Sequence, residues 1–157
     1  LTDAAIADAL QLNLAAPIDL VRQLQPTLQA VVLVGSQAGQ VPLPYLALYG
    51  ATKAGLMALG EALRYEWPAV QILIAAPPGT RTAMTAGLAE AAGWRQFPLL
   101  EADIVGKRIV KALLAGRETV SFGPLHALPV WLYRWWPGLV RRICQSQRHR
   151  FAKMFAR

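Results

Sequence analysis

The sequence is short of cysteine, of acidic residues in its last part and of long apolar runs, and each shortage excludes a class of protein. A single cysteine, Cys144, cannot form an internal disulfide, and no His/Cys cluster has the spacing of metal ligands, which excludes a disulfide scaffold and a structural zinc site. No uninterrupted apolar run reaches the ~18–20 residues of a spanning helix, and no basic and apolar leader opens the sequence. We therefore expect a cytoplasmic protein that neither spans a membrane nor is exported.

The composition that is present fits one globular domain with unevenly distributed charge. The 157 residues are 55% apolar and 16% charged, which allows a real hydrophobic core. Residues 1–123 hold 9 Lys/Arg and 9 Asp/Glu, whereas residues 124–157 hold 7 Lys/Arg and no acid. Because the excess charge belongs to the last segment, a nucleic-acid partner is not expected for the protein as a whole.

Apolar periodicity and turn residues predict helices alternating with short buried strands. Buried strands separated by helices indicate a layered α/β fold with a parallel sheet and right-handed crossovers. Two further helices, separated at Pro137 and Gly138, are expected in residues 124–157. The other expected elements are a helix over 2–25 with a bend near Pro17, a strand over 30–34, a helix over 46–66, a strand over 70–75, a helix over 101–115 and a strand over 119–122.

Three polar residues are expected at one edge of this sheet. Tyr49 and Lys53 are four residues apart near the start of a helix, so their side chains share one face. Ser36 follows the strand 30–34, at the edge where open α/β sheets bind ligands. A phenol, an ammonium and a hydroxyl together suit proton transfer. The alternative is ordinary: a helix-surface contact for the pair and a turn serine for Ser36.

These residues resemble the active-site pattern of the short-chain dehydrogenase/reductases, in which a serine after a strand precedes Tyr-x-x-x-Lys by 13 residues, the spacing between Ser36 and Tyr49. Val-Leu-Val-Gly-Ser-Gln-Ala-Gly at 32–39 is similar to the family's serine segment, and Tyr-Gly-Ala-Thr-Lys-Ala at 49–54 to its active-site helix. Leu-Asn-Leu-Ala-Ala-Pro at 12–17 resembles the family's asparagine segment, and Glu-Ala-Leu-Arg-Tyr-Glu at 61–66 the end of its Tyr/Lys helix.

The resemblance implies a role for each matching residue. Tyr49 would be the general acid in reduction and the base in oxidation, while Lys53 would stabilise its phenolate and contact the nicotinamide ribose. Ser36 would bind the substrate oxygen. Asn13 would hold a water that connects Lys53 to solvent; alternatively, it bonds the backbone at a helix bend.

A second segment, Pro78-Gly79-Thr80-Arg81-Thr82, looks like the family's loop that contacts nicotinamide and phosphate. In many members the threonine lies four residues after the glycine, whereas Thr82 lies three after Gly79, so Thr80 is a rival for its role. Residues 83–100 take the place of the family's substrate loop. Trp94 and Phe97 there either line an apolar pocket for the substrate or pack internally.

The family's Gly-rich cofactor turn and its acidic ribose-binding residue are missing from the sequence. We therefore expect residues 1–123 to be the C-terminal part of such a domain, with a partial Rossmann-like, doubly wound parallel sheet, in a sequence that begins partway through a longer protein. The resemblance implies an NAD- or NADP-dependent oxidoreductase that interconverts a small apolar carbonyl compound and a secondary alcohol. It further implies that the complete protein is a homo-oligomer and that the fragment alone is inactive.

Residues 124–157 form a separate Trp- and Arg-rich segment, the tail, for which two interpretations remain open. Trp131, Trp135 and Trp136 beside arginines are typical of a helix at a membrane interface, which would make the protein peripherally membrane-associated. Alternatively, these aromatics cover the substrate cleft or a partner subunit. The competing hypothesis for the whole chain is a non-enzymatic remnant that acts through this tail as an interaction or membrane-surface module.

Overall fold

The computed structural model describes residues 2–85 and 99–155, and its first part is one continuous helix. Helix α1 (Asp3–Leu10) starts at Thr2, whose side chain accepts a hydrogen bond from the N–H of Ala5 at 3.2 Å. A π-helical segment, η1 (Gln11–Ala15), leads into α2 (Ala16–Leu24) and a final 3₁₀ turn, η2 (Gln25–Thr27). The departure from α geometry therefore lies just before the expected bend at Pro17.

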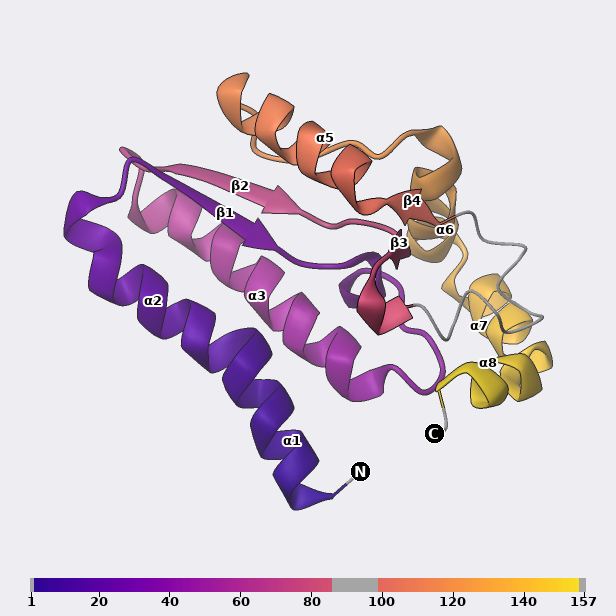
Figure 1. Cartoon of the computed structure of the whole chain (residues 1–157). Helices are drawn as coiled ribbons and strands as arrows, with labels where there is room; N and C mark the ends of the chain where they lie inside the picture. The colour runs from indigo at the N-terminus through magenta and orange to yellow at the C-terminus, as the bar shows by residue number, and fades with distance from the viewer. Residues whose placement is uncertain (1, 86–98, 156–157) are drawn as a thin grey trace.

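In the described residues, the main sheet consists of two of the three parallel strands that the sequence predicts. Strand β1 (Ala30–Val34) pairs with β2 (Gln71–Ala75) over its full length, with Ala30 opposite Gln71 and Val34 opposite Ala75. Helix α3 (Ala47–Glu66) is the crossover between them. Figure 1 shows both strands between α5 on one side and the α1–α2 helix on the other. This arrangement confirms the expected α/β class with parallel strands.

The expected strand over 119–122 is reduced to a single parallel bridge between Ile74 and Thr119. Here the N–H of Ile74 donates to the oxygen of Glu118 at 2.9 Å. A strand needs a succession of such bonds, but the chain leaves the sheet by Gly123, where a φ of 95° leads into the next helix. The prediction of a full third strand is therefore wrong, although the segment lies where a third strand would pair.

The main core lies between one face of the sheet and helices α2 and α3. At Gly60 of α3, an added Cβ would lie 2.8 Å from side-chain atoms of Leu33 and Ile74, so the absence of a side chain lets the helix approach the strands closely. The buried cluster consists of Val21, Val31, Leu33, Leu56, Leu63, Ile72 and Ile74.

A small two-stranded sheet and a helix follow the main strands. Strand β3 (Thr80–Arg81) pairs in parallel with β4 (Leu100–Glu101), and the 3₁₀ turn η4 (Ala83–Thr85) follows β3. Helix α5 (Ala102–Leu114) begins directly after β4 and contacts β2. This helix is close to the one expected over 101–115.

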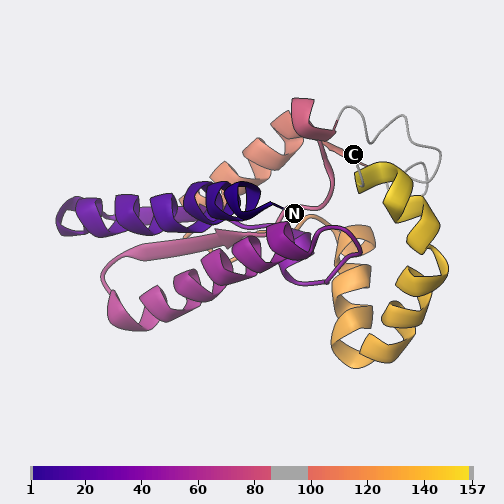
Figure 2. The same cartoon turned by 90° about the horizontal axis from the view of Figure 1, so that it is seen from below.

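Residues 124–155 of the tail form three helices where the sequence predicted two. Helix α6 (Pro124–Trp135) and α7 (Pro137–Ser146) are separated at Trp136, one residue before the expected break. Helix α8 (Arg148–Phe155) follows Gln147 and was not anticipated. The three helices gather beyond the carboxyl ends of β1 and β2 (Figure 2).

Within residues 2–85 and 99–155, one helix is long and apolar enough to cross a membrane by length and composition alone: Asp3–Thr27. This differs from the expectation, which considered only uninterrupted apolar runs; in this helix polar residues such as Gln11, Asn13 and Asp19 interrupt the apolar residues. Core helices of soluble proteins meet the same test, so the finding is weak grounds for a spanning segment.

Candidate functional site

The Ser36 segment is fixed by main-chain bonds to the last residue of β2 and to the loop that follows it. The N–H of Gly35 donates to the oxygen of Ala75 at 2.7 Å, and the N–H of Gln37 donates to the oxygen of Pro77 at 3.1 Å. Ser36 itself caps the short 3₁₀ turn η3 (Gln37–Gly39), and its Oγ accepts from the N–H of Ala38 at 3.1 Å. This bond uses a lone pair of the Ser36 oxygen and not the hydroxyl proton.

Two glycines bring this segment against helix α3. A Cβ added to Gly39 would lie 2.8 Å from the backbone nitrogen of Ala54, and one added to Gly50 would lie 2.7 Å from the carbonyl oxygen of Ala38. Both contacts are with backbone, which cannot move aside as a side chain can. The close approach therefore places the turn after Ser36 directly on the helix that carries Tyr49 and Lys53.

Lys53 joins the exit of β1 to the Tyr49 side chain. Its Nζ donates to the main-chain oxygen of Val34 at 3.1 Å and lies 5.9 Å from the centroid of the Tyr49 ring. Burial lowers the pKa of Lys53 from its ordinary value, because desolvation disfavours the ammonium. The hydroxyl of the buried Thr52 donates to the main-chain oxygen of Tyr49 at 2.8 Å. Tyr49 and Lys53 thus meet at the end of β1, beside the Ser36 segment.

Asn13 lies in the π-helical segment η1, which packs against α3. The contact is close at Gly55, where an added Cβ would be 3.3 Å from Leu14. The helix therefore departs from regular α geometry at Asn13. Its role in a water relay stays a prediction.

The loop after β2 is organised by a threonine that the sequence analysis did not single out. Thr85 is 8% exposed. Its hydroxyl donates to the main-chain oxygen of Thr80 at 2.6 Å and accepts from the N–H of Thr82 at 2.9 Å. The Thr80 hydroxyl donates to the oxygen of Pro78 at 2.9 Å. Threonine side chains often bond to the backbone three residues earlier, so the spacing of Thr82 and Thr85 in the sequence could have indicated this contact.

The loop of Pro78, Gly79, Thr80 and Thr82 lies at the same edge as Ser36, because Gln37 bonds to the neighbouring Pro77. Gly79 is also tied into the small sheet, since its oxygen accepts from the N–H of Leu100 at 3.0 Å. Trp94 and Phe97 lie outside the described residues. Their assignment to the substrate site stays a prediction.

Helix α6 of the tail is attached to the site through Gln37. The Gln37 side-chain amide donates to the main-chain oxygen of His126 at 2.5 Å. Burial lowers the pKa of His126, and the positive charge of Arg108 lowers it further. Sequence reasoning had no signal for this contact, because the two residues are far apart in the chain.

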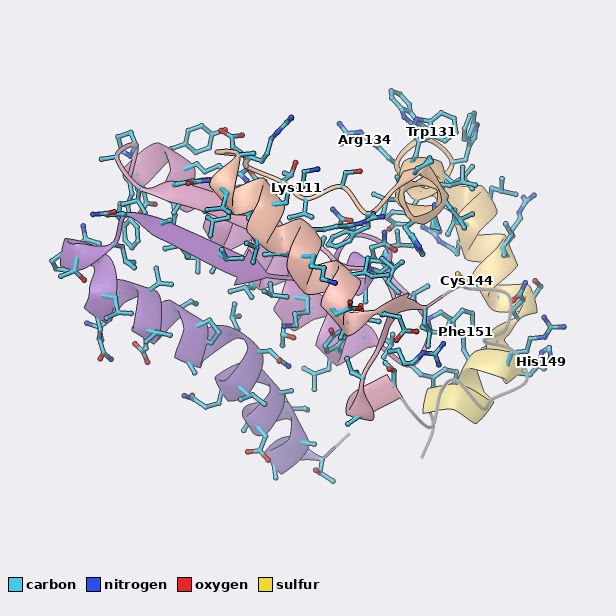
Figure 3. All side chains as sticks on the ribbon, turned by 45° about the horizontal axis from the view of Figure 1, so that its top comes forward. Lys111, Trp131, Arg134, Cys144, His149 and Phe151 are labelled. Atoms are coloured by element: carbon cyan, nitrogen blue, oxygen red, sulfur yellow. The ribbon has the colours of Figure 1, made fainter. Side chains whose placement is uncertain are left out.

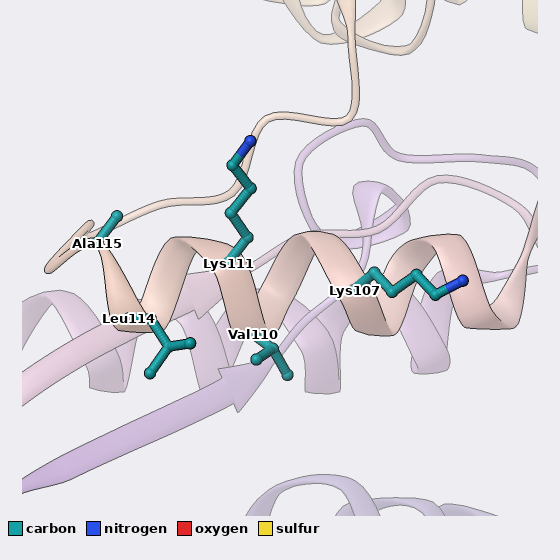
Figure 4. Close-up of a pocket in the computed structure, with 5 residues that line it drawn as sticks. All are labelled: Lys107, Val110, Lys111, Leu114 and Ala115. Atoms are coloured by element: carbon teal, nitrogen blue, oxygen red, sulfur yellow. The ribbon is translucent and has the colours of Figure 1, made fainter.

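A shallow groove lies away from this site, on the surface of α5. It is lined by Lys107, Val110, Lys111, Leu114 and Ala115 (Figure 4). None of these residues belongs to the Ser36, Tyr49 and Lys53 cluster. The groove therefore adds nothing to the candidate site.

The chain is similar to short-chain dehydrogenases in sequence and in structure. A family model described as short chain dehydrogenase matches residues 1–93. The structure is similar to a short chain dehydrogenase from Burkholderia cenocepacia J2315 in complex with NADP, with a TM-score of 0.77, 20% identity and coverage of 90% of this chain and 61% of that one. It is also similar to a short-chain dehydrogenase from Sphingobium yanoikuyae in complex with NADPH, with a TM-score of 0.67, 24% identity and coverage of 93% and 58%.

No curated protein matches the chain. At these identities the two solved structures establish the fold alone. This chain spans about three fifths of the length of either one.

Proposed function

Because the chain belongs to the short chain dehydrogenase family, we propose that it is the later part of an NAD- or NADP-dependent oxidoreductase that interconverts a carbonyl group and a secondary alcohol. The observation that carries this proposal is the position of Lys53. Its ammonium lies between the exit of β1 and the Tyr49 ring, next to the segment of Ser36. This is an arrangement suited to moving a proton at a sheet edge.

Each residue has a defined task in the proposed reaction. In reduction, the Ser36 hydroxyl donates a hydrogen bond to the substrate carbonyl oxygen and the Tyr49 hydroxyl transfers its proton to that oxygen. The Lys53 ammonium stabilises the phenolate that remains. In oxidation the phenolate takes the proton back from the alcohol. A bound nicotinamide cofactor supplies or accepts the hydride.

The described residues fit one half of such a cofactor. An ammonium has three donors, and Lys53 uses one on Val34, which leaves donors for a ribose hydroxyl. The loop of Pro78, Gly79, Thr80 and Thr82 would lie against the nicotinamide and a phosphate. No Gly-rich turn leads into a helix in residues 2–85 and 99–155, so the pyrophosphate half of the site is not supplied by this part of the chain.

The isolated chain is therefore proposed to be inactive, and the complete protein to act as a homo-oligomer on a small apolar substrate. The open edge of the main sheet supports association with a further segment or chain. Among the described strands β1 pairs only with β2, and Val34 of β1 is 44% exposed. The outer face of the α1–α2 helix also exposes leucines, including Leu12 at 74%. Both surfaces are suited to a covering segment.

The proposal is tested with a longer version of the protein that carries an upstream glycine-rich turn in frame. Oxidation of NADH or NADPH is followed by absorbance with a panel of small apolar ketones, and the 157-residue chain is the control. The proposal expects turnover by the longer version and none by the control. A longer version that binds the cofactor but transfers hydride to no ketone would exclude the function.

A further inference from the structure

Helix α6 of the tail has a partly buried inner face and an outer face on which large apolar side chains are exposed. His126, Pro129, Val130 and Tyr133 are partly buried on its inner face. The residues of the outer face recur at helical spacing and are exposed: Leu125 at 62%, Leu128, Trp131 at 50% and Trp135 at 62%. A large exposed apolar stripe of this kind marks an interaction site.

The stripe continues past the end of α6. Trp136 lies between α6 and α7 and is 51% exposed, and its ring meets that of Trp131 edge-on at 5.2 Å between centroids. Leu139, in the first turn of α7, is also exposed. We call the following six residues the tail patch: Leu125, Leu128, Trp131, Trp135, Trp136 and Leu139.

Arginines border the tail patch, and the segment contains no acid to oppose them. Arg134, Arg141 and Arg142 are exposed on α6 and α7, and residues 124–157 contain no Asp or Glu. Figure 3 shows Trp131 and Arg134 projecting together from the outer side of the tail. The surface therefore combines exposed indole rings with unopposed positive charge.

We propose that the tail patch docks on an anionic lipid surface. Indole rings settle at the boundary between headgroups and acyl chains, and arginines are attracted to anionic headgroups. A second copy of the chain would bring one basic tail against another, so charge disfavours it as the occupant. The proposal is independent of the proposed reaction, because it uses none of the residues of that site.

The attachment of α6 gives the docked orientation. Its inner face is held to the protein by the bond from Gln37 to His126, which leaves the tail patch facing outward. The tail helices lie beyond the carboxyl ends of β1 and β2 (Figure 2). In a docked chain, α6 therefore lies between the membrane and Gln37 of the Ser36 segment.

The test is flotation of the 157-residue chain with vesicles in a density gradient, since lipid-bound protein rises and aggregates sink. Vesicles of phosphatidylcholine alone are compared with vesicles that also contain phosphatidylglycerol. The chain is expected to float with the anionic vesicles and to lose binding as salt is added. The double variant Trp131→Gln/Trp135→Gln is expected to weaken binding at least about tenfold, and Arg134→Gln/Arg141→Gln/Arg142→Gln about a hundredfold.

Two matched controls isolate the tail patch. Leu12→Gln/Leu20→Gln removes two exposed apolar residues from the α1–α2 helix, and Lys107→Gln/Lys111→Gln/Arg117→Gln removes three exposed charges on and just after α5. The leucine control is expected to keep its binding to the anionic vesicles. The charge control lowers net charge equally, so it is expected to bind at least tenfold more tightly than the arginine variant.

Several results would overturn the proposal. The first is failure of the wild-type chain to float with anionic vesicles. The second is undiminished flotation of the tryptophan variant, which would assign binding to another segment such as the α1–α2 helix. The third is a tryptophan variant that floats normally but changes from oligomer to monomer in lipid-free sedimentation, which would make a second copy the occupant.

Discussion

The Nζ of Lys53 lies 3.1 Å from the main-chain oxygen of Val34, so a side chain of α3 closes the end of strand β1. The acceptor is a neutral carbonyl and not a carboxylate. The ammonium therefore keeps its full charge for the neighbouring Tyr49, while half-burial strengthens the effect of that charge. The hydrogen bond also fixes the ammonium in position, whereas the ammonium of a flexible surface lysine would be free to move.

The first prediction concerns Tyr49, the proposed proton donor, in a longer version of the protein that carries the cofactor half. Tyr49→Phe is expected to lower kcat by about 10²–10⁴, since the ring stays and only the transferable proton is lost. Cofactor binding is expected to persist. Steady-state kinetics and quenching of intrinsic fluorescence by NADPH measure the two effects separately.

Lys53→Met in the same protein is expected to damage both turnover and cofactor binding, because in the proposed reaction the ammonium would both stabilise the phenolate and offer donors to a ribose. The contrast with Tyr49→Phe is the diagnostic result. A tyrosine variant that keeps more than about a tenth of the wild-type kcat would contradict the assignment of Tyr49.

The second prediction concerns the contact between the Ser36 turn and α3. Gly39→Ala and Gly50→Ala are each expected to lower the free energy of unfolding by about 1–3 kcal/mol, because the new methyl meets backbone at 2.8 Å or less. Gly106→Ala is the matched control. Nothing lies within 4 Å of its added Cβ in helix α5, so it is expected to stabilise by about 0.5–1 kcal/mol. Urea unfolding measures all three, and equal effects would refute the close approach.

The third prediction concerns stability below neutral pH. The pKa of His126 is lowered from 6.5 by burial and by Arg108, so the unfolded chain takes up this proton before the folded chain does. The contribution to stability is therefore complete above about pH 6.5 and is lost as the pH falls below that value. His126→Gln is expected to reduce this acid-induced loss, as measured by urea midpoints at several pH values.

The other histidine provides the control for this experiment. His149 is exposed on α8, so His149→Gln is the matched substitution that removes an imidazole at an exposed position. Identical pH profiles for the wild type and the His126 variant would contradict the lowered pKa of His126.

The fourth prediction concerns Thr85. Thr85→Val removes a buried hydroxyl that bonds to both Thr80 and Thr82, and it is expected to cost about 1–3 kcal/mol of stability. Thr119→Val is the same change at an exposed position and is expected to stay within about 0.5 kcal/mol. Thermal unfolding compares the two, and equal melting temperatures would contradict a structural role for Thr85.

The fifth prediction concerns the isolated chain. We expect it to bind NAD(H) and NADP(H) poorly, because residues 2–85 and 99–155 offer no glycine turn for the pyrophosphate, and to self-associate through the open edge of β1. Calorimetry and analytical ultracentrifugation test the two statements. Micromolar cofactor affinity in a monodisperse monomer would overturn both.

Sequence patterns predicted most of this fold because its elements are marked locally. The strand over 30–34 is an apolar run closed by glycine, and the crossover helix has apolar residues at regular spacing, so both were predicted within one residue. The third strand failed because residues 119–122 have strand-like composition, but pairing depends on distant partners. Helix α8 was missed because no proline or glycine marks its start after Gln147.

The candidate site was predictable only in part. The spacing of Ser36, Tyr49 and Lys53 is visible in the sequence, whereas the contacts that assemble them are not. The carbonyl of Val34 that holds Lys53 is a backbone atom, common to every residue, so no side-chain pattern could identify it. The bond from Gln37 to His126 depends on where the tail returns in space. Whether Ser36 and Tyr49 share one substrate oxygen stays a prediction.

The register of β1 on β2 also determines how this chain folds. Ala30 pairs with Gln71, so no short hairpin can start the sheet and a long loop must close first. Helix α3 lies within that loop, so once the helix has formed the loop that must close is shorter, and Gly60 allows the helix to lie close to both strands. We therefore expect mutations that weaken α3 to slow folding more than they speed unfolding.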